Sequence, residues 1–383
     1  MPPQRAFRRN RYRFFITFFV LILLLHVYIG WRLLPAMATN APDWIIGIGY
    51  LCLSAFLIPL GMTARFMRLR PALADRLSWL GSLLLGLFSS LLVLTLLREL
   101  LLLFSPDSAL KENSAFFVLV LAILMTAIGF INARRTPRVV KITVPIDGLP
   151  SALKDFRIVQ ISDLHIGPTI KRNYVTAIIN RVNALQPDVI AVTGDIVDGS
   201  VDQLIAHIAP LGLMQAQYGA YVVTGNHEYY SGADQWLAEF RRLGMRTLMN
   251  EHVVIEYRGA RIVIAGVTDF NAERFNFDQR SDPAQAILGA PEQWHVPKIL
   301  LAHQPRSAQK AEAAGFDLQL SGHTHGGQFW PWNLFVPLQQ PFTAGLHRMG
   351  HLWVYTSRGT GYWGPPKRFG APSEISLIQL VCA

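Results

Sequence analysis

The chain has 383 residues, of which 51% are hydrophobic, and its mean hydropathy is +0.28. This composition is that of a membrane-rich chain, and its two cysteines exclude a disulfide framework and a thiolate metal site. The net charge of +10 does not indicate nucleic acid binding, because much of it lies in basic clusters that flank apolar stretches and favour an anionic membrane surface.

Four apolar stretches occupy the first third of the chain, at residues 14–34, 44–62, 77–97 and 115–131. Each is near the roughly 20 residues that a helix needs to cross a bilayer. Only short polar links separate them, which argues against the buried helices of a soluble protein. We therefore predict a bundle of four transmembrane helices within a membrane domain at residues 1–135, followed by a second domain at residues 136–383.

Basic residues are distributed unevenly among the links. They gather before the first stretch, between the second and third, and after the fourth: Arg5, Arg8, Arg9, Arg11, Arg13, Arg65, Arg68, Arg70, Arg76, Arg134, Arg135, Arg138 and Lys141. The other two links contain only Lys111. By the positive-inside rule, both termini are expected in the cytoplasm, with the second domain at the inner face of a bacterial plasma membrane.

A competing interpretation treats the N-terminus as an export signal. Arg8 and Arg9 would form a twin-arginine element, and residues 36–38 (Ala-Met-Ala) a cleavage site. The first apolar stretch is long for such a signal, and three more stretches follow it. Protease accessibility in sealed cells distinguishes the two orientations, because export would place the second domain outside.

Strand and helix patterns alternate in the second half of the chain. Apolar, β-branched runs at 157–161, 189–193, 221–224, 298–302 and 318–320 predict buried strands. Helical patterns fall at 173–185 and 201–213, a hairpin at 252–257 and 261–267 with a link at 258–260, and later strands at 352–356 and 374–380. Alternation followed by hairpins predicts two sheets flanked by helices.

Polar side chains follow five of these strands. They are Asp163 and His165, then Asp195, Asn226, His303, and finally His323 and His325. Open α/β sheets place their sites at the carboxyl ends of strands. In extended backbone, Asp163 and His165 would point the same way. The mixture of imidazole nitrogen and oxygen donors favours a pair of transition-metal ions such as Mn, Zn, Fe or Ni over Mg or Ca.

These motifs stand in a fixed order: D-x-H at 163–165, G-D-x-x-D at 194–198, G-N-H-E at 225–228, H at 303 and G-H-x-H at 322–325. The set resembles the calcineurin-like metallophosphoesterases, from about residue 141 to the end. The sequences S-D-L-H at 162–165 and G-H-T-H-G-G-Q at 322–328 look most like the bacterial membrane-associated phosphodiesterase branch. The resemblance implies a four-layer α/β/β/α sandwich behind the membrane helices.

The resemblance also implies a binuclear metal centre. One divalent ion would take Asp163, His165, Asp195 and His325, and the other would take Asp195, Asn226, His303 and His323. His227 would be the catalytic residue that faces the leaving group, while Asp198 and Glu228 would orient loops and ligands. Two ions about 3.5–4 Å apart would activate a hydroxide for in-line attack on phosphorus.

We therefore expect a membrane-anchored dimetal phosphoesterase acting on a phosphodiester, phosphomonoester or pyrophosphate, with a lipid-linked substrate preferred. A hydrolase like the UDP-diacylglucosamine pyrophosphatases is a specific alternative. A second alternative is a non-catalytic membrane sensor that binds metal and nucleotide, and a third makes the helices a transporter. The sequence does not fix the oligomeric state.

Several residues outside the motifs are further candidates. Residues 329–349 hold five aromatic side chains and three prolines, which predicts a loop beside the active site; with Tyr362 and Trp363 it would form an apolar rim for a lipid tail. Arg306, Arg358, Lys367 and Arg368 are candidates for binding phosphate, and Arg358 is the best placed. Other histidines are weaker candidates: His207, His252, His295, His347 and His351.

Overall fold

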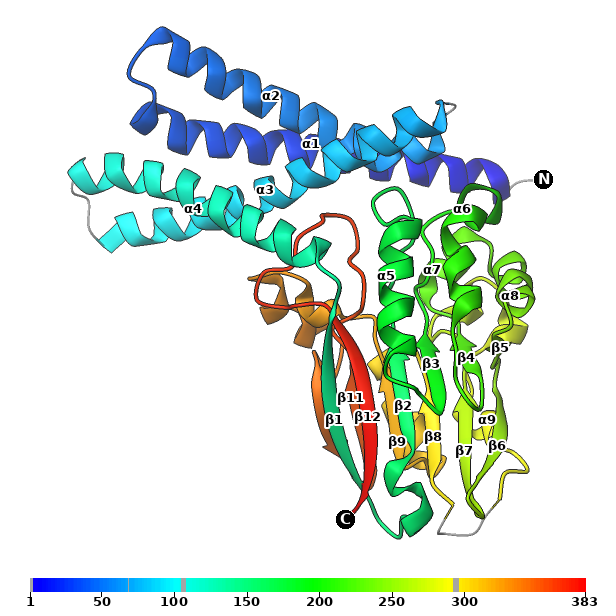
Figure 1. Cartoon of the computed structure of the whole chain (residues 1–383). Coiled ribbons are helices and arrows are strands. Elements are labelled where there is room, and N and C mark those ends of the chain that lie inside the picture. Colours follow the sequence, from blue (N-terminus) through cyan, green and yellow to red (C-terminus); the bar gives the residue numbers. More distant parts are fainter. Residues whose placement is uncertain (1–2, 68, 105–107, 292–295) are drawn as a thin grey trace. The chain divides into compact units, whose positions relative to one another are not determined.

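The computed structural model describes the backbone of residues 3–67, 69–104, 108–291 and 296–383, and their side chains except those of 3–15, 66, 108 and 109. Two compact units are present (Figure 1). The first comprises Met1–Phe130 with Gly364–Lys367, and the second comprises Ile131–Trp363 with Arg368–Ala383. Arg68, His295 and the side chains of the five arginines before the first stretch lie outside the described residues.

The first unit is built from long apolar helices: α1 (Pro3–Met37), α2 (Ala41–Thr63), α3 (Pro71–Phe104) and α4 (Ser108–Arg134), whose last turn belongs to the second unit. Four segments are long and apolar enough to cross a membrane: Ile16–Met37, Ala41–Thr63, Pro71–Phe104 and Leu110–Arg134. The four predicted transmembrane helices are thus confirmed, and each is longer than the stretch read from the sequence. The structure extends them because polar residues at their ends continue the helix.

Small residues let α2 and α3 approach closely. A Cβ on Gly61 would lie 2.9 Å from the Cα of Gly81 and 2.5 Å from the Leu77 carbonyl oxygen. Ser78 Oγ donates a hydrogen bond to the Gly61 carbonyl at 3.0 Å. Close contact of small residues with hydrogen bonds across helices is the usual packing of membrane helices, where lipid supplies no hydrophobic drive.

The first sheet of the second unit has the strand order β1-β12-β2-β3-β4-β5 (Figure 1). Its strands are β1 (Arg138–Ile146), β2 (Arg157–Ile161), β3 (Val189–Thr193), β4 (Ala220–Val223), β5 (Arg246–Thr247) and β12 (Glu374–Cys382). All neighbours are parallel except β12 and β2. The carboxyl ends of β2, β3 and β4 therefore meet at one edge of the sheet.

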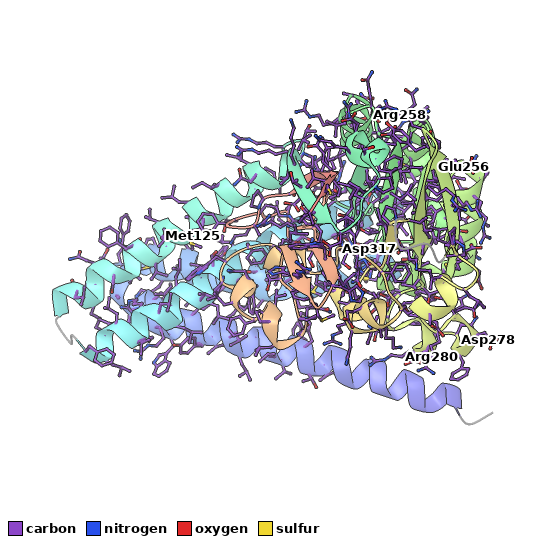
Figure 2. All side chains as sticks on the ribbon, turned by 90° about the horizontal axis from the view of Figure 1, so that it is seen from below. Met125, Glu256, Arg258, Asp278, Arg280 and Asp317 are labelled. Atoms are coloured by element: carbon purple, nitrogen blue, oxygen red, sulfur yellow. The ribbon has the colours of Figure 1, made fainter. Side chains whose placement is uncertain are left out.

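The second sheet has the order β10-β11-β9-β8-β7-β6. Its strands are β6 (Glu251–Tyr257), β7 (Ala260–Gly266), β8 (Lys298–Leu301), β9 (Leu318–Ser321), β10 (Gly345–Met349) and β11 (Leu352–Thr356). The strands β7, β8, β9 and β11 are parallel, and β6 and β10 are antiparallel edge strands. Arg258 lies in the tight turn of the β6–β7 hairpin, near Glu256 (Figure 2).

Three apolar cores separate four layers. One core lies between the first sheet and the helices α5 (Arg172–Asn183), α6 (Val201–Ile208) and α8 (Ala233–Arg242). A second lies between the two sheets, and a third joins the second sheet to α9 (Pro283–Ala286) and α10 (Ala308–Ala313). A short helix α7 (Asn226–Ser231) follows β4. The predicted α/β/β/α sandwich after four apolar helices is confirmed.

Several elements were not predicted from the sequence, among them β1, β5 and the helices α7 to α10. Strand β1 was not predicted, and it pairs with β12 along nine residues at the edge of the first sheet. The segment 329–349 was predicted as a loop throughout, but its last five residues form the edge strand β10. Both strands lie at sheet edges, where half-exposed polar residues interrupt the apolar run that marks a buried strand.

Candidate metal centre

The carboxyl ends of strands from both sheets deliver the predicted ligands. Asp163 and His165 follow β2, Asp195 follows β3, and Asn226 begins α7 after β4. His303 follows β8, and His323 and His325 follow β9 of the second sheet. All of these side chains except His323 are buried. The structure therefore gathers the seven residues from two sheets, although they span 163 positions of the chain.

The backbone at these residues is unusual. Five of them have left-handed φ angles: Asp163 (54°), His165 (50°), Asp195 (52°), His323 (69°) and His325 (53°). Each such non-glycine residue costs about 1–3 kcal/mol, and strain of this kind concentrates at functional sites. The extended backbone expected at Asp163 and His165 is wrong, because both have left-handed φ angles, but the two side chains do belong to one potential metal-binding group.

The ligand atoms form two clusters. In the first, Nε2 of His165 lies 3.0 Å from Nε2 of His325, which is 3.5 Å from Asp163 Oδ1. In the second, Nε2 of His303 lies 3.1 Å from Nδ1 of His323 and 3.1 Å from Asp195 Oδ2. That same Asp195 oxygen is 3.9 Å from Nε2 of His165. Asp195 therefore faces both clusters.

The donor atoms fit a pair of divalent cations. Two ligands at right angles on one ion, with bonds of about 2.1 Å, lie about 3.0 Å apart, which is the spacing of both histidine pairs. Asn226 Oδ1 is buried and accepts no hydrogen bond within the described structure, as expected of an oxygen that coordinates a cation when the metal is bound. Asp163, His165 and His325 form one potential metal-binding group, and Asp195, His303 and His323 form another.

The electrostatics of the clusters agree with this fit. Burial lowers the pKa of His323 to about 3, and burial together with Arg368 lowers the pKa of His325 well below its usual value. Both rings therefore keep a lone pair for a metal at neutral pH. Burial would raise the pKa of Asp195, but the charges of His303 and His227 hold it well below its usual range. The carboxylate between the clusters is thus ionised.

Two glycines permit the close approach of the segments that carry the ligands. A Cβ on Gly225 would lie 2.2 Å from Asp195 Oδ1, and a Cβ on Gly322 would lie 2.2 Å from Asp163 Oδ2. Any larger residue would displace the carboxylate. These positions explain physically why glycine begins both the 225–228 and the 322–325 motifs.

Two carboxylates, half-buried Asp198 and buried Glu228, organise the residues around the clusters. Asp198 Oδ1 lies 3.2 Å from His165 Nδ1 and 2.5 Å from His227 Nδ1, so one oxygen orients two rings. Glu228 accepts hydrogen bonds from the backbone N–H groups of Gly225, Asp195, Ile196 and Val197 at 2.7–3.3 Å. The turn after β3 and the start of α7 are thereby fixed to each other.

His227 lies beside the second cluster with its Nε2 3.9 Å from Asp195 Oδ2. Burial opposes its charge, but Asp195 and Asp198 outweigh burial and raise the pKa of His227 to about 9. Its ring centroid lies 5.3 Å from that of Tyr230 and 5.8 Å from that of Trp363. The imidazole is therefore cationic at neutral pH and flanked by two aromatic rings.

Arg368 has a role that the sequence did not reveal. Its fully buried guanidinium donates to His325 Nδ1 at 2.9 Å and to the carbonyl oxygens of His325, Arg358 and Gly361 at 2.5–3.1 Å. It therefore positions His325, whereas the sequence suggested only phosphate binding. This contact could not be predicted, because nothing in the local sequence places residue 368 next to residue 325.

The other three basic residues that were candidates for binding phosphate donate hydrogen bonds to other groups of the protein. Arg358 donates to Glu374 at 3.0 Å, and Arg306 donates to the Gln339 carbonyl at 2.6 Å. Lys367 belongs to the first unit, where its Nζ donates to the Gly86 carbonyl and to Ser90 and Thr126 hydroxyls.

The other candidate histidines that the structure describes lie outside the potential metal-binding groups. His252 Nδ1 lies 2.9 Å from the Ala286 carbonyl, His347 Nε2 lies 2.9 Å from the Ala344 carbonyl, and His351 pairs with Glu312 at 3.2 Å. His207 is half-buried on α6. None of the four joins the two clusters of the centre.

The segment 329–349 divides into a buried and an exposed part. Phe329 is buried, whereas Trp332 is 43% exposed and Leu338 is 81% exposed. Leu334 and Phe335 are exposed to intermediate degrees. Trp363 is 53% exposed, but Tyr362 is buried and its hydroxyl donates to the Thr169 carbonyl. The apolar rim predicted from the sequence therefore excludes Tyr362.

Comparisons with known proteins indicate the family of this chain. A family model for calcineurin-like phosphoesterases matches residues 156–327. A transmembrane protein with a metallophosphoesterase domain from Danio rerio is 37% identical over 72% of this chain and 65% of its own length. An uncharacterised metallophosphoesterase of Campylobacter jejuni is 35% identical over 69% of this chain and 68% of its own length. One from Aquifex aeolicus is 32% identical over 63% of this chain and 91% of its own length.

The chain belongs to the calcineurin-like metallophosphoesterase family. The resemblance drawn from the motifs is therefore confirmed, and the four apolar helices make this chain an integral membrane member of the family. The chain spans 65% of the length of the Danio rerio relative and 64% of that of a Bos taurus relative with the same description.

Proposed function

We propose that this protein is a membrane-anchored dimetal phosphoesterase that hydrolyses phosphodiester or pyrophosphate bonds. One divalent ion is held by Asp163, His165, Asp195 and His325, and the other by Asp195, Asn226, His303 and His323. The observation that carries the proposal is the pair of histidine clusters, with nitrogen spacings of 3.0 and 3.1 Å, that faces the single carboxylate of Asp195.

A pair of bound ions supplies Lewis acidity and a hydroxide nucleophile at neutral pH. The protein's own residues supply the remaining chemistry. Asp195 offers one carboxylate to both clusters, and its negative charge reduces the repulsion between two cations. Neutral Asn226 adds an oxygen donor without adding charge. Arg368 and Asp198 hold the rings of His325 and His165, since each contacts the nitrogen that faces away from the cluster.

His227 is the general acid in this proposal. Its raised pKa, to about 9, keeps a proton on the ring at neutral pH, and Asp198 fixes the ring through Nδ1 so that Nε2 faces the site. Proton donation to a leaving oxygen is typically worth about 10²–10⁴ in rate. No serine or cysteine nucleophile is needed.

A lipid-linked substrate is favoured by apolar side chains near the site. Trp332, Leu334, Phe335 and Leu338 are exposed on the segment that follows the last metal motif. Exposed apolar groups of this kind are unusual on a surface that meets only water, and they are suited to an acyl chain or a bilayer surface. Four membrane-spanning helices on the same chain would keep the enzyme beside such a substrate.

A lipid nucleotide is the second candidate, in the manner of UDP-diacylglucosamine hydrolases. Tyr230, Phe275 and Trp363 are each at least 51% exposed around His227, and the rings of Tyr230 and Phe275 lie 5.6 Å apart. Exposed aromatic faces beside a leaving-group acid can stack against a base. Hydrolysis of a lipid phosphodiester but not of a lipid nucleotide would remove this candidate.

We place the catalytic unit on the cytoplasmic side of a bacterial inner membrane. Basic residues gather at 65–76 and from 134 onward, whereas residues 35–43 and 105–114 contain only Lys111. Protease treatment of sealed spheroplasts tests this orientation, because a cytoplasmic unit is protected until the membrane is opened.

The first experiment is hydrolysis of bis-p-nitrophenyl phosphate by detergent-purified full-length protein with added Mn²⁺, compared with Asp195→Asn. We expect activity in the wild type and loss of about two orders of magnitude or more in the variant. Metal bound by both proteins without turnover in either, on this ester and on lipid esters, would instead support a metal-binding sensor.

A further inference from the structure

A cavity of about 210 Å³ lies within the second unit, at the point where the chain leaves α4. Two segments line it, residues 132–138 and residues 368–373. It is smaller than the roughly 300–1,000 Å³ of sites that enclose whole drug-sized ligands. It has ample room for a single tetrahedral oxyanion with a few waters.

The charged groups that line this cavity are all cationic. Arg135 and Arg138 are exposed, and neither has an ion-pair partner within the described parts of the chain. Arg368 lines the cavity with its backbone, because its guanidinium donates to His325. Two unpaired guanidinium groups around one small cavity form a suitable partner for phosphate, whose oxygens match the planar donor fork of arginine.

Neutral hydrogen-bond donors also line the cavity. Asn132 Nδ2 donates one hydrogen bond to the Arg368 carbonyl at 3.2 Å, which joins the two segments and leaves a second N–H for a ligand. Ser373 is buried and donates to the Gly361 carbonyl, which fixes the far side. Thr136 contributes an exposed hydroxyl, and Pro137 restricts the backbone between the two arginines.

The position of the cavity along the chain indicates where its ligand comes from. The last membrane-spanning segment ends at Arg134, and Arg135 is the next residue. Arg138 lies at most about 14 Å of extended chain beyond Arg134. The polar layer on each side of a bilayer is roughly 5–8 Å thick, so residues this close to a span lie at headgroup depth or just beyond it.

We propose that this cavity binds a phosphate oxyanion through Arg135 and Arg138, and that the phosphate belongs to the headgroup of an anionic phospholipid. The site is distinct from the metal centre, because none of the seven proposed metal ligands lines it. A bound headgroup would tie the start of the catalytic unit to the membrane surface. Inorganic phosphate presents the same oxygens, so an experiment must separate the two sources.

The test is native mass spectrometry of the full-length chain in detergent with added phosphatidylglycerol. EDTA is present throughout, so that phosphate cannot bind at the metal centre. The variant is Arg135→Gln combined with Arg138→Gln, both at exposed positions. The matched control is Arg172→Gln combined with Arg181→Gln, which removes the same charge from exposed positions on α5. A second arm titrates inorganic phosphate without lipid and follows the melting temperature.

We expect the 135/138 variant to retain phosphatidylglycerol about tenfold more weakly than the wild type, while the 172/181 control retains it normally. If the variant instead loses only the stabilisation by inorganic phosphate, the oxyanion site stands and its ligand is free phosphate. Equal lipid retention and equal phosphate stabilisation in wild type, variant and control would overturn the proposal. Melting temperatures within about 2 °C of wild type confirm that the variants fold.

Discussion

Gly322→Ala tests whether the backbone of the last metal motif is built around the Asp163 carboxylate. A Cβ at residue 322 would lie 2.2 Å from Asp163 Oδ2 and 2.0 Å from Ser162 Oγ. Ordinary contact begins at 3.4 Å, so the carboxylate oxygen must retreat by about 1.2 Å. Metal–ligand distances tolerate only about 0.2 Å, and this methyl group is therefore incompatible with Asp163 as a ligand in its present place.

The expected losses follow from that displacement. A misplacement of about 1 Å costs on the order of 10²-fold in rate, which corresponds to about 2.7 kcal/mol in the barrier. Overpacking adds a destabilisation of about 1–3 kcal/mol. We expect kcat/KM on bis-p-nitrophenyl phosphate to fall by about 10² or more, together with loss of bound metal measured by elemental mass spectrometry.

Gly212→Ala is the matched control. Its added Cβ would come closer than ordinary contact only to the end of the flexible Leu243 side chain, at 3.2 Å, and the Leu243 carbonyl oxygen and Cβ lie at 3.7 and 3.9 Å. This variant should keep its metal and its activity. The reasoning would be refuted if Gly322→Ala also kept a full complement of metal and an activity within about threefold of wild type.

Four further predictions concern the proton donor, its partner, the metals and the apolar surface. His227→Gln should slow hydrolysis of alkyl phosphodiesters by about 10²–10⁴-fold, with a smaller effect on a p-nitrophenyl ester that leaves readily; equal losses on both would argue against a general acid. Asp198→Asn should weaken metal binding by about 10–100-fold in a dialysis titration, because its oxygen lies 3.2 Å from the ligand His165; unchanged binding would show that this contact does not hold the ring. Removing metal with EDTA should lower the melting temperature, and Mn²⁺ at 100 times its Kd should restore about 2.7 kcal/mol; no shift in scanning fluorimetry would contradict a metal site in the native fold. Trp332→Ala combined with Leu338→Ala should reduce hydrolysis of phospholipid in vesicles while leaving a soluble ester unaffected, and equal losses on both would sink the lipid-contact interpretation.

The sequence was sufficient for the strands that end at the site. The runs 157–161 and 189–193 coincide with β2 and β3, since apolar residues make up most of both strands and every residue except Arg157 is buried. The four membrane segments could also be predicted from the sequence, because a helix that crosses a bilayer must be long and apolar whatever the tertiary structure. The edge strands β1 and β10 were not predicted, because their half-exposed residues give no such continuous signal.

The sequence by itself determined which residue types are present for two metal ions, because glycine, carboxylate and imidazole stand at fixed spacings after apolar strands. Only the tertiary structure decided how they meet: the chain reaches the site through left-handed turns at Asp163, His165, Asp195, His323 and His325, which strand alternation does not predict. The contact of Arg368 with His325 and the cavity beside Arg135 and Arg138 also appear only in the fold. Residues far apart in the chain share no local pattern. Only the packing of distant segments brings Arg368 to His325 and places residues 368–373 opposite the two arginines.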